Sequence, residues 1–218
     1  MSLKNLFQCL GLLFAFQALD VFGRELSLNP KDCHHIGFED IKPTEYSYDS
    51  KQKVLTAKVV ESSSILVIPF DSIELINQVS FAWKASGKLP STDLAKLNEK
   101  EGDDAVLRVG LLVHGEPPMF SFTAPAWLKK VSKVLKYPSD KLLYLVAGLE
   151  KQGAKWYSPY SDTIEQIAIN AVPADDKQWK MSMHSFKEPL KAVGVWIIAD
   201  GDNSKVTFQT ELKNLKLN

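Results

Sequence analysis

Acidic and amide side chains gather near the C-terminus of the 218-residue chain, where the sequence reads IIADGDNSK. Asp200, Asp202 and Asn203 offer oxygen atoms, which Ca²⁺ prefers as ligands, although the spacing lacks the glycine and distant glutamate of an EF-hand loop. Gly201 and Asn203 readily accept a positive φ, and Asp200 and Ser204 can bond the turn backbone. A tight turn between two strands is therefore predicted, with calcium as the alternative and no other cofactor indicated.

A second group of charges surrounds the apolar run AVLRVGLLVHG. Asp103 and Asp104 precede this run, and Arg108 falls on the same face as Asp104 if a strand begins early. A semi-buried arginine usually has a carboxylate partner, so an ion pair that pins the loop is predicted. Paired carboxylates also serve as general acid and base, and this is the alternative interpretation.

Side chains should alternate along residues 105–114, because successive residues of a strand point to opposite faces of the sheet. One face is apolar throughout and is predicted to be core. The other carries Arg108, Gly110, Leu112 and His114. This mixed face either lines a concave ligand site or is half exposed, and a glycine within a strand also marks a bulge.

Aromatic residues are concentrated in the segment WYSPYSD. The apolar face of a sugar ring packs on an aromatic ring while its hydroxyls seek carboxylates and amides. Trp156 is interpreted as a plug at the end of the fold. Tyr160 is a candidate ligand contact, because the neighbouring proline and serines indicate an exposed loop.

The elements that position these residues are short strands rich in β-branched and aromatic residues, separated by Ser, Asp, Pro or Gly. Nine or more strands without alternating helices predict a mainly β fold, an antiparallel β-sandwich or jelly roll. One amphipathic helix is predicted in TAPAWLKKVSKVLKYP, because Trp127, Val131, Val134 and Leu135 share one helical face. Its lysines lie mainly on the other face, and the helix is expected to pack on the sheet.

The N-terminus predicts export. MSLKN carries a positive charge, and the apolar run LFQCLGLLFAFQAL is shorter than the roughly 18 residues that a membrane-spanning helix needs. Residues 1–23 are predicted as a signal peptide cleaved after Gly23, with Ala18 as the alternative cleavage site. The single β-sandwich domain of residues 24–218 is then soluble and either periplasmic or secreted. Cleavage leaves Cys33 without a cysteine partner, so no intramolecular disulfide is expected.

Several of these motifs occur together in a known family. The stretches EGDDAVLRVGLLVHG, KLLYLVAGLE, SPYSDTIEQIAI and VGVWIIADGDNSKVTFQTELKNLKL resemble, in order and spacing, the bacterial exported family called domain of unknown function 3047 (DUF3047). The resemblance covers roughly residues 34–218. It implies a β-sandwich similar to carbohydrate-binding jelly rolls and implies no established activity.

Three classes of function fit the sequence. Lys plus Arg and Asp plus Glu are equal at 26 each, so no excess positive charge is available for nucleic acid. Serine-nucleophile, phosphate-loop and dinucleotide motifs do not occur. The favoured class is a non-catalytic binding module for a carbohydrate or another polar cell-envelope ligand; the alternatives are a glycan-active enzyme that uses an aspartate pair and a structural or assembly protein. If one surface is functional, six residues should be neighbours: Asp104, Arg108, Tyr160, Asp200, Asp202 and Asn203.

Overall fold

Strands make up most of the protein in the computed structural model, which describes residues 23–90, 93–116, 126–149, 151–169 and 177–218. The predicted signal peptide lies almost wholly outside these residues. The strands are β1 (Arg24–Glu25), β2 (His34–Gly37), β3 (Glu45–Asp49), β4 (Val54–Val60), β5 (Ser64–Gly87), β6 (Ala105–His114), β7 (Ser139–Ala147), β8 (Lys155–Ser158), β9 (Ser161–Ala168), β10 (Lys180–Asp200) and β11 (Thr207–Leu217). Three short 3₁₀ helices, η1 (Pro30–Asp32), η2 (Leu94–Lys96) and η3 (Lys100–Gly102), and one α-helix, α1 (Ala126–Val134), complete the described elements.

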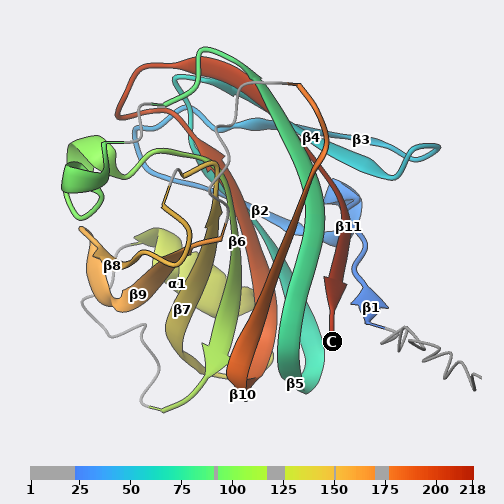
Figure 1. The fold of residues 1–218 in the computed structure, drawn as a ribbon. Coiled ribbons are helices and arrows are strands. Elements are labelled where there is room, and N and C mark those ends of the chain that lie inside the picture. The colour runs from blue at the N-terminus through green and yellow to red at the C-terminus, as the bar shows by residue number, and fades with distance from the viewer. Residues whose placement is uncertain (1–22, 91–92, 117–125, 150, 170–176) are drawn as a thin grey trace, which may run out of the picture.

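All eleven strands belong to one sheet, in the order β3-β4-β11-β5-β10-β6-β7-β9-β8, with β1 on β11 and β2 on β5. Strands β5 and β10 are by far the longest, and they run side by side through the molecule (Figure 1). The second half of β5 pairs with β11, whereas residues 192–200 of β10 pair with β6. These two strands therefore connect two halves of the sheet. One half contains β3, β4 and β11, and the other contains β6, β7, β9 and β8.

The main core lies between the two halves. Trp83 of β5 and Leu55 of β4 belong to the same buried cluster as Leu111 of β6 and Ile197 of β10. All four side chains are at most 2% exposed. Burying a large apolar side chain stabilises the fold by on the order of 1.5–3 kcal/mol, and many such side chains hold the two halves face to face. This confirms the predicted mainly β sandwich.

A second core covers the outer face of the half that contains β6, β7 and β10. Helix α1 packs there through Val131, with Trp127, Val134 and Leu135 against the same cluster. This confirms the predicted amphipathic helix. Leu112 and Trp196 are buried beneath it. Both faces of the central strands are thus covered. On the mixed face of β6, Arg108, Gly110 and Leu112 are buried, and only His114 at the end of the strand is half exposed.

The two longest strands each join separate apolar runs of the sequence. Residues 64–70 and 73–85 lie in one strand, β5, and residues 180–186 and 191–200 lie in β10. A register shift between Ala192 and Gly194 places Val193 in the outer cluster, whereas Val195 lies in the main core. Strands β7 and β9 pair in parallel, so the sheet is mixed rather than purely antiparallel.

Candidate functional site

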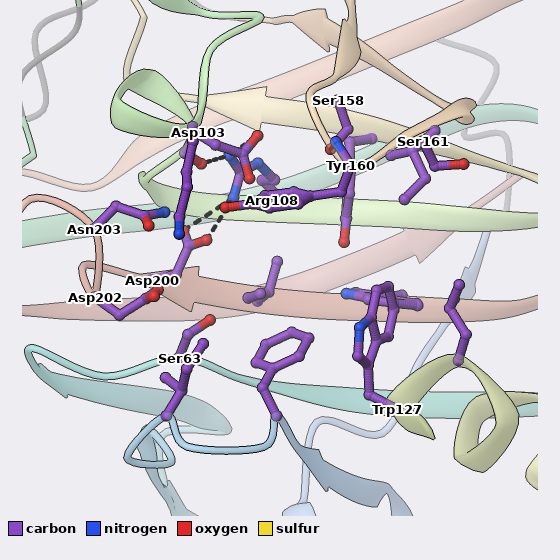
Figure 2. A pocket seen from close by; sticks show the side chains of 18 of the residues that line it. Ser63, Asp103, Arg108, Trp127, Ser158, Tyr160, Ser161, Asp200, Asp202 and Asn203 are labelled. Atoms are coloured by element: carbon purple, nitrogen blue, oxygen red, sulfur yellow. Dashed lines mark hydrogen bonds and ion pairs between the residues drawn. The ribbon is translucent and has the colours of Figure 1, made fainter. Parts of the chain in front are cut away.

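A pocket of about 990 Å³ opens on the outer face of β6, β7, β9 and β10, beside helix α1. The strands contribute Arg108, Tyr144 and Trp196, while connecting segments contribute many of the remaining residues. Figure 2 shows Tyr160 and Trp127 on opposite sides of the pocket, with Asp200 and Asp202 at one end. The alternation along β6 explains the position of Arg108, because its neighbours Leu107 and Val109 face the main core.

The buried guanidinium of Arg108 organises the polar end of the pocket (Figure 2). Its Nη1 donates to both carboxylate oxygens of Asp200, at 2.9 and 2.8 Å, and its Nε donates to Gln166 Oε1 at 2.9 Å. Its Nη2 donates to the carbonyl oxygen of Asp103 and lies 3.4 Å from Asp103 Oδ1. Gln166 Nε2 also donates to Asp103, at 3.2 Å. Each nitrogen of the guanidinium therefore has an acceptor within the protein.

Asp104 has a different role from the one that the sequence predicted. Strand β6 begins at Ala105, and Asp104 accepts hydrogen bonds from the backbone and side-chain nitrogens of Asn203, at 3.3 and 3.2 Å, and from the backbone nitrogen of Ser204. Arg108 does form the predicted ion pair, but Asp104 is not its partner. Asp200 and Asp103 bind the guanidinium instead. Asp104 holds the loop that carries Asp202.

The loop after β10 is a tight turn, as expected, but it is built differently. It joins β10 to β11, and β5 lies between these two strands in the sheet. The residue with positive φ is Lys205, at 52°, rather than Gly201 or Asn203. Gly201 is required by packing, because a Cβ atom there would lie 2.7 Å from Val206 Cγ2. Asp200 bonds outside the turn and accepts from the backbone nitrogen of Ala105 at 2.8 Å.

Aromatic rings form the other end of the pocket. Phe38, Trp127, Trp196 and Tyr144 make successive edge-to-face contacts, with ring centroids 5.3, 5.6 and 5.9 Å apart, a favourable geometry for aromatic pairs. Gly110 provides room for the last ring, since a Cβ atom on it would lie 3.0 Å from Tyr144 Cδ1. A strand glycine thus permits ring packing here and does not mark a bulge.

The two tyrosines of WYSPYSD differ in position although both are more than half exposed. Tyr160, at 55% exposed, lines the pocket, whereas Tyr157, at 56%, does not. Trp156 packs against the outer core, and its Nε1 is buried without a hydrogen-bond partner among the described residues. This agrees with the interpretation of Trp156 as a plug.

Burial and crowding of negative charge shift the acid–base behaviour of the polar end. Burial raises the pKa of Asp200 to about 7, against the opposing effect of Arg108. Burial also raises the pKa of Asp103 and of Asp202, and the neighbouring Asp104 adds to both shifts. For Arg108, burial alone would lower the pKa, but Asp200 and Asp103 hold it above its ordinary value. The charge of Arg108 is therefore used to compensate buried carboxylates.

The structure brings together the six residues that the sequence selected. Arg108 contacts Asp200, Asp104 contacts Asn203, and one carboxylate oxygen of Asp202 lies within 4.8 Å of an oxygen of Asp104 and of Asp200. Tyr160 lines the same pocket, and burial, followed by Asp103, raises the pKa of its hydroxyl to about 12. Arg108 and Asp200 were expected to be adjacent if one surface is functional, and they are.

Calcium stays a hypothesis. One oxygen each from Asp104, Asp200 and Asp202 could reach a common cation, whereas Ca²⁺ takes six to eight oxygens. Asp200 already binds Arg108, and Asp104 already binds the loop nitrogens. A cation would have to share both carboxylates with these donors.

Several residues of the pocket and of the hydrogen-bond network around Arg108 were not selected from the sequence. Gln166 lies in the apolar segment TIEQIAI, where a lone buried amide is a usable signal because buried polar groups need partners. Trp127 was assigned only to the packing face of the predicted helix, and Trp196 and Tyr144 were not selected at all. Their shared position depends on where α1 and the β6–β7 pair lie on the sheet, which local patterns do not give.

These observations define a β-sandwich domain with a ligand-sized pocket on one outer face. The chain belongs to the family described as "Protein of unknown function (DUF3047)", whose model matches residues 32–216, and this confirms the resemblance drawn from the sequence. No curated protein sequence matches the chain.

Solved structures that match the chain distantly include carbohydrate-binding domains. A mutant of the family 29 carbohydrate-binding module CBM29-2 is 10% identical with a TM-score of 0.35, and the match covers 90% of this chain and 88% of that one. A second CBM29-2 mutant, in complex with cellulohexaose, is 11% identical with a TM-score of 0.34 and coverage of 88% and 84%. The metal-free carbohydrate recognition domain of Emp46p is 10% identical with a TM-score of 0.37 and coverage of 84% and 88%. In the described part of the chain no helix has the length and apolar character needed to span a membrane.

Proposed function

We propose that this protein is an exported, non-catalytic binding module whose pocket takes a carbohydrate or a similar polar ligand of the cell envelope. The observation that carries the proposal is the composition of the pocket. Aromatic rings, including Trp127 and Tyr160, line one part of it, and the carboxylates of Asp200 and Asp202 with the amide of Asn203 line the other. Sugars present an apolar ring face together with hydroxyls, so they need both kinds of surface at once.

The size of the pocket supports the same proposal. A volume of about 990 Å³ lies at the upper end of the roughly 300–1,000 Å³ range of small-molecule sites and would accommodate more than one sugar ring. The proposal rests on these residues alone, because the likeness to carbohydrate-binding modules at TM-scores near 0.35 is too distant to transfer a ligand.

The engagement of the carboxylates favours binding over hydrolysis. A glycosidase needs one carboxylic acid to donate a proton and a second carboxylate to act as nucleophile or base. Asp200 is bound to Arg108 and to a backbone nitrogen, and Asp104 is bound to the loop of Asn203 and Ser204. Two of the four candidate aspartates, Asp103, Asp104, Asp200 and Asp202, are thus engaged in hydrogen bonds that hold the pocket together.

Calorimetric titration with a panel of neutral, amino and acidic oligosaccharides tests the proposal. We expect at least one member to bind, and Tyr160→Ala to weaken it about ten-fold, since aromatic contacts contribute on the order of 0.5–1.5 kcal/mol beyond their buried area. Tyr157→Ala is the matched control, because Tyr157 is equally exposed and outside the pocket. The proposal is wrong if no oligosaccharide binds. It is also wrong if both variants bind the oligosaccharide with the affinity of the wild-type protein.

A further inference from the structure

The charges that line the pocket do not balance. Its described lining contains five acidic and three basic side chains, Glu39, Glu101, Asp103, Asp200 and Asp202 against Lys100, Arg108 and Lys205. Two acids and two bases of this set are exposed at the rim. They compensate one another and are screened by salt, so the excess of negative charge belongs to the interior.

The inner part of the described lining contains three carboxylates, those of Asp103, Asp200 and Asp202, and one cation. The buried carboxylate of Asp104 lies within 4.8 Å of those of Asp200 and Asp202 without lining the pocket. Arg108 is 4% exposed and directs its donors to Asp200, Gln166 and Asp103. A guanidinium with this set of acceptors has little donor capacity left for the carboxylate of an acidic ligand. The polar end therefore holds more carboxyl groups than Arg108 can neutralise.

The raised pKa values of Asp103 and Asp202 agree with this geometry. Burial is the largest cause for both, and the carboxylate of Asp104 adds to it. A cation placed between these groups would favour their ionised forms. A ligand that brings a positive charge is thus favoured over a neutral one of the same shape.

The aromatic end complements a cation attached to a ring. The edge-to-face series that runs through Trp127 and Trp196 provides an apolar wall, and Tyr160 faces it from the other side (Figure 2). Aromatic faces attract both the C–H face of a sugar and a nearby ammonium group. The two ends of the pocket together fit a molecule with one cationic end and one ring.

We propose that the ligand is an amino sugar, or a glycan that contains one with its amine free, bound with its ammonium group among Asp103, Asp200 and Asp202 and its ring between Tyr160 and Trp127. This inference rests on the proposed carbohydrate-binding function and specifies its ligand class. A glycan whose amines are acetylated has the same ring but lacks the charge, and it should bind more weakly.

The test compares two oligosaccharides of equal length, a glucosamine oligomer and an N-acetylglucosamine oligomer, by calorimetric titration of the full chain at about pH 6 and low salt. We expect the free-amine oligomer to bind at least about ten-fold more tightly, and the difference to shrink in high salt, because rim and ligand charges are screened. Asp202→Asn should remove most of the difference, whereas Tyr160→Ala should weaken both ligands. Asp162→Asn, a charge change at an exposed residue of β9 that does not line the pocket, should leave both affinities unchanged.

Each other outcome overturns the inference in a distinguishable way. If the acetylated oligomer binds as tightly, or an acidic oligosaccharide binds best, the amine is not the recognised group although carbohydrate binding survives. If a chelator abolishes binding, the positive charge is a metal ion. If no oligosaccharide binds, the proposed function fails with the inference. Thermal melts of each variant show whether a lost affinity reflects a lost fold.

Discussion

Replacing Arg108 with methionine should destabilise the protein strongly, although arginine is polar and methionine is a good core residue. Arg108 and Asp200 are 4% and 7% exposed at the side chain, and their closest contact is 2.8 Å. Removing one partner of a buried ion pair leaves an uncompensated charge and costs about 3–5 kcal/mol. For a domain of this size each kcal/mol corresponds to about 2–4 °C, so the melting temperature should fall by about 10 °C.

The cost should depend on pH in a defined direction. In the variant, Asp103 and Asp200 lose the guanidinium that lowers their pKa values while the burial that raises them remains. The native state then binds more protons than the unfolded chain between about pH 4 and the raised pKa values, so stability falls as the pH rises through that window. The slope for one proton is at most about 1.4 kcal/mol per pH unit. We expect a larger loss at pH 8 than at pH 5.

Urea unfolding followed by tryptophan fluorescence, in a cycle of Arg108→Met, Asp200→Asn and the double variant, isolates the pair. Asparagine keeps an oxygen for the backbone nitrogen of Ala105, which Asp200 accepts in the wild type. The double variant should be more stable than the sum of the single effects by about 1–3 kcal/mol. A loss below about 1 kcal/mol for Arg108→Met at pH 8, or additive effects in the cycle, would show that the network around Arg108 is not a coupled unit.

Three further predictions concern other parts of the molecule. Val131→Ala, at the fully buried centre of α1, should cost about 2 kcal/mol in chemical denaturation, while Lys130→Ala on the exposed face of the same helix should change stability by no more than about 0.5 kcal/mol; equal effects would contradict the packing of α1 on the sheet. Burial raises the pKa of the Cys33 thiol to about 11, so alkylation at neutral pH should be roughly a hundred times slower than for an unperturbed thiol, and rapid labelling of the native protein would contradict this. We expect the exported protein to begin at Arg24, and a mass spectrum that shows residue 1 retained after export would refute cleavage at Gly23.

The parts of the fold that the sequence predicted are those set by local pattern. The alternation along residues 105–114 placed Arg108 on the face opposite Leu107 and Val109, and the 3.6-residue spacing in α1 identified the side that Val131 buries. The extent of β5 and β10 could not be read in this way, because each contains a polar stretch that looks like a loop until the partner strand is known. The register shift between Ala192 and Gly194 was hidden for the same reason.

The sequence predicted which residues form the site better than it predicted which of them contact one another. Asp200 lies 92 residues from Arg108 in the chain, and the two meet because the pairing of β10 with β6 places Asp200 opposite Ala105. The start of β6 then decides that Asp103 faces the guanidinium while Asp104 turns to the loop of Asn203. One residue of difference in a strand boundary exchanged the roles of two adjacent aspartates.

The long pairing of β5 with β10 has a consequence for how the chain reaches its native state. The pair joins Trp83 to Lys180 at one end and Ile65 to Ile198 at the other, so its contacts span on the order of 100 residues of sequence. Closing such loops costs entropy before any contact repays it, and β proteins with distant pairings fold in milliseconds to seconds. Strand β5 acquires β10 and β11, two of its three partner strands, only after residues 180–217 have been synthesised. A growing chain therefore remains without its central sheet until β10 and β11 have emerged.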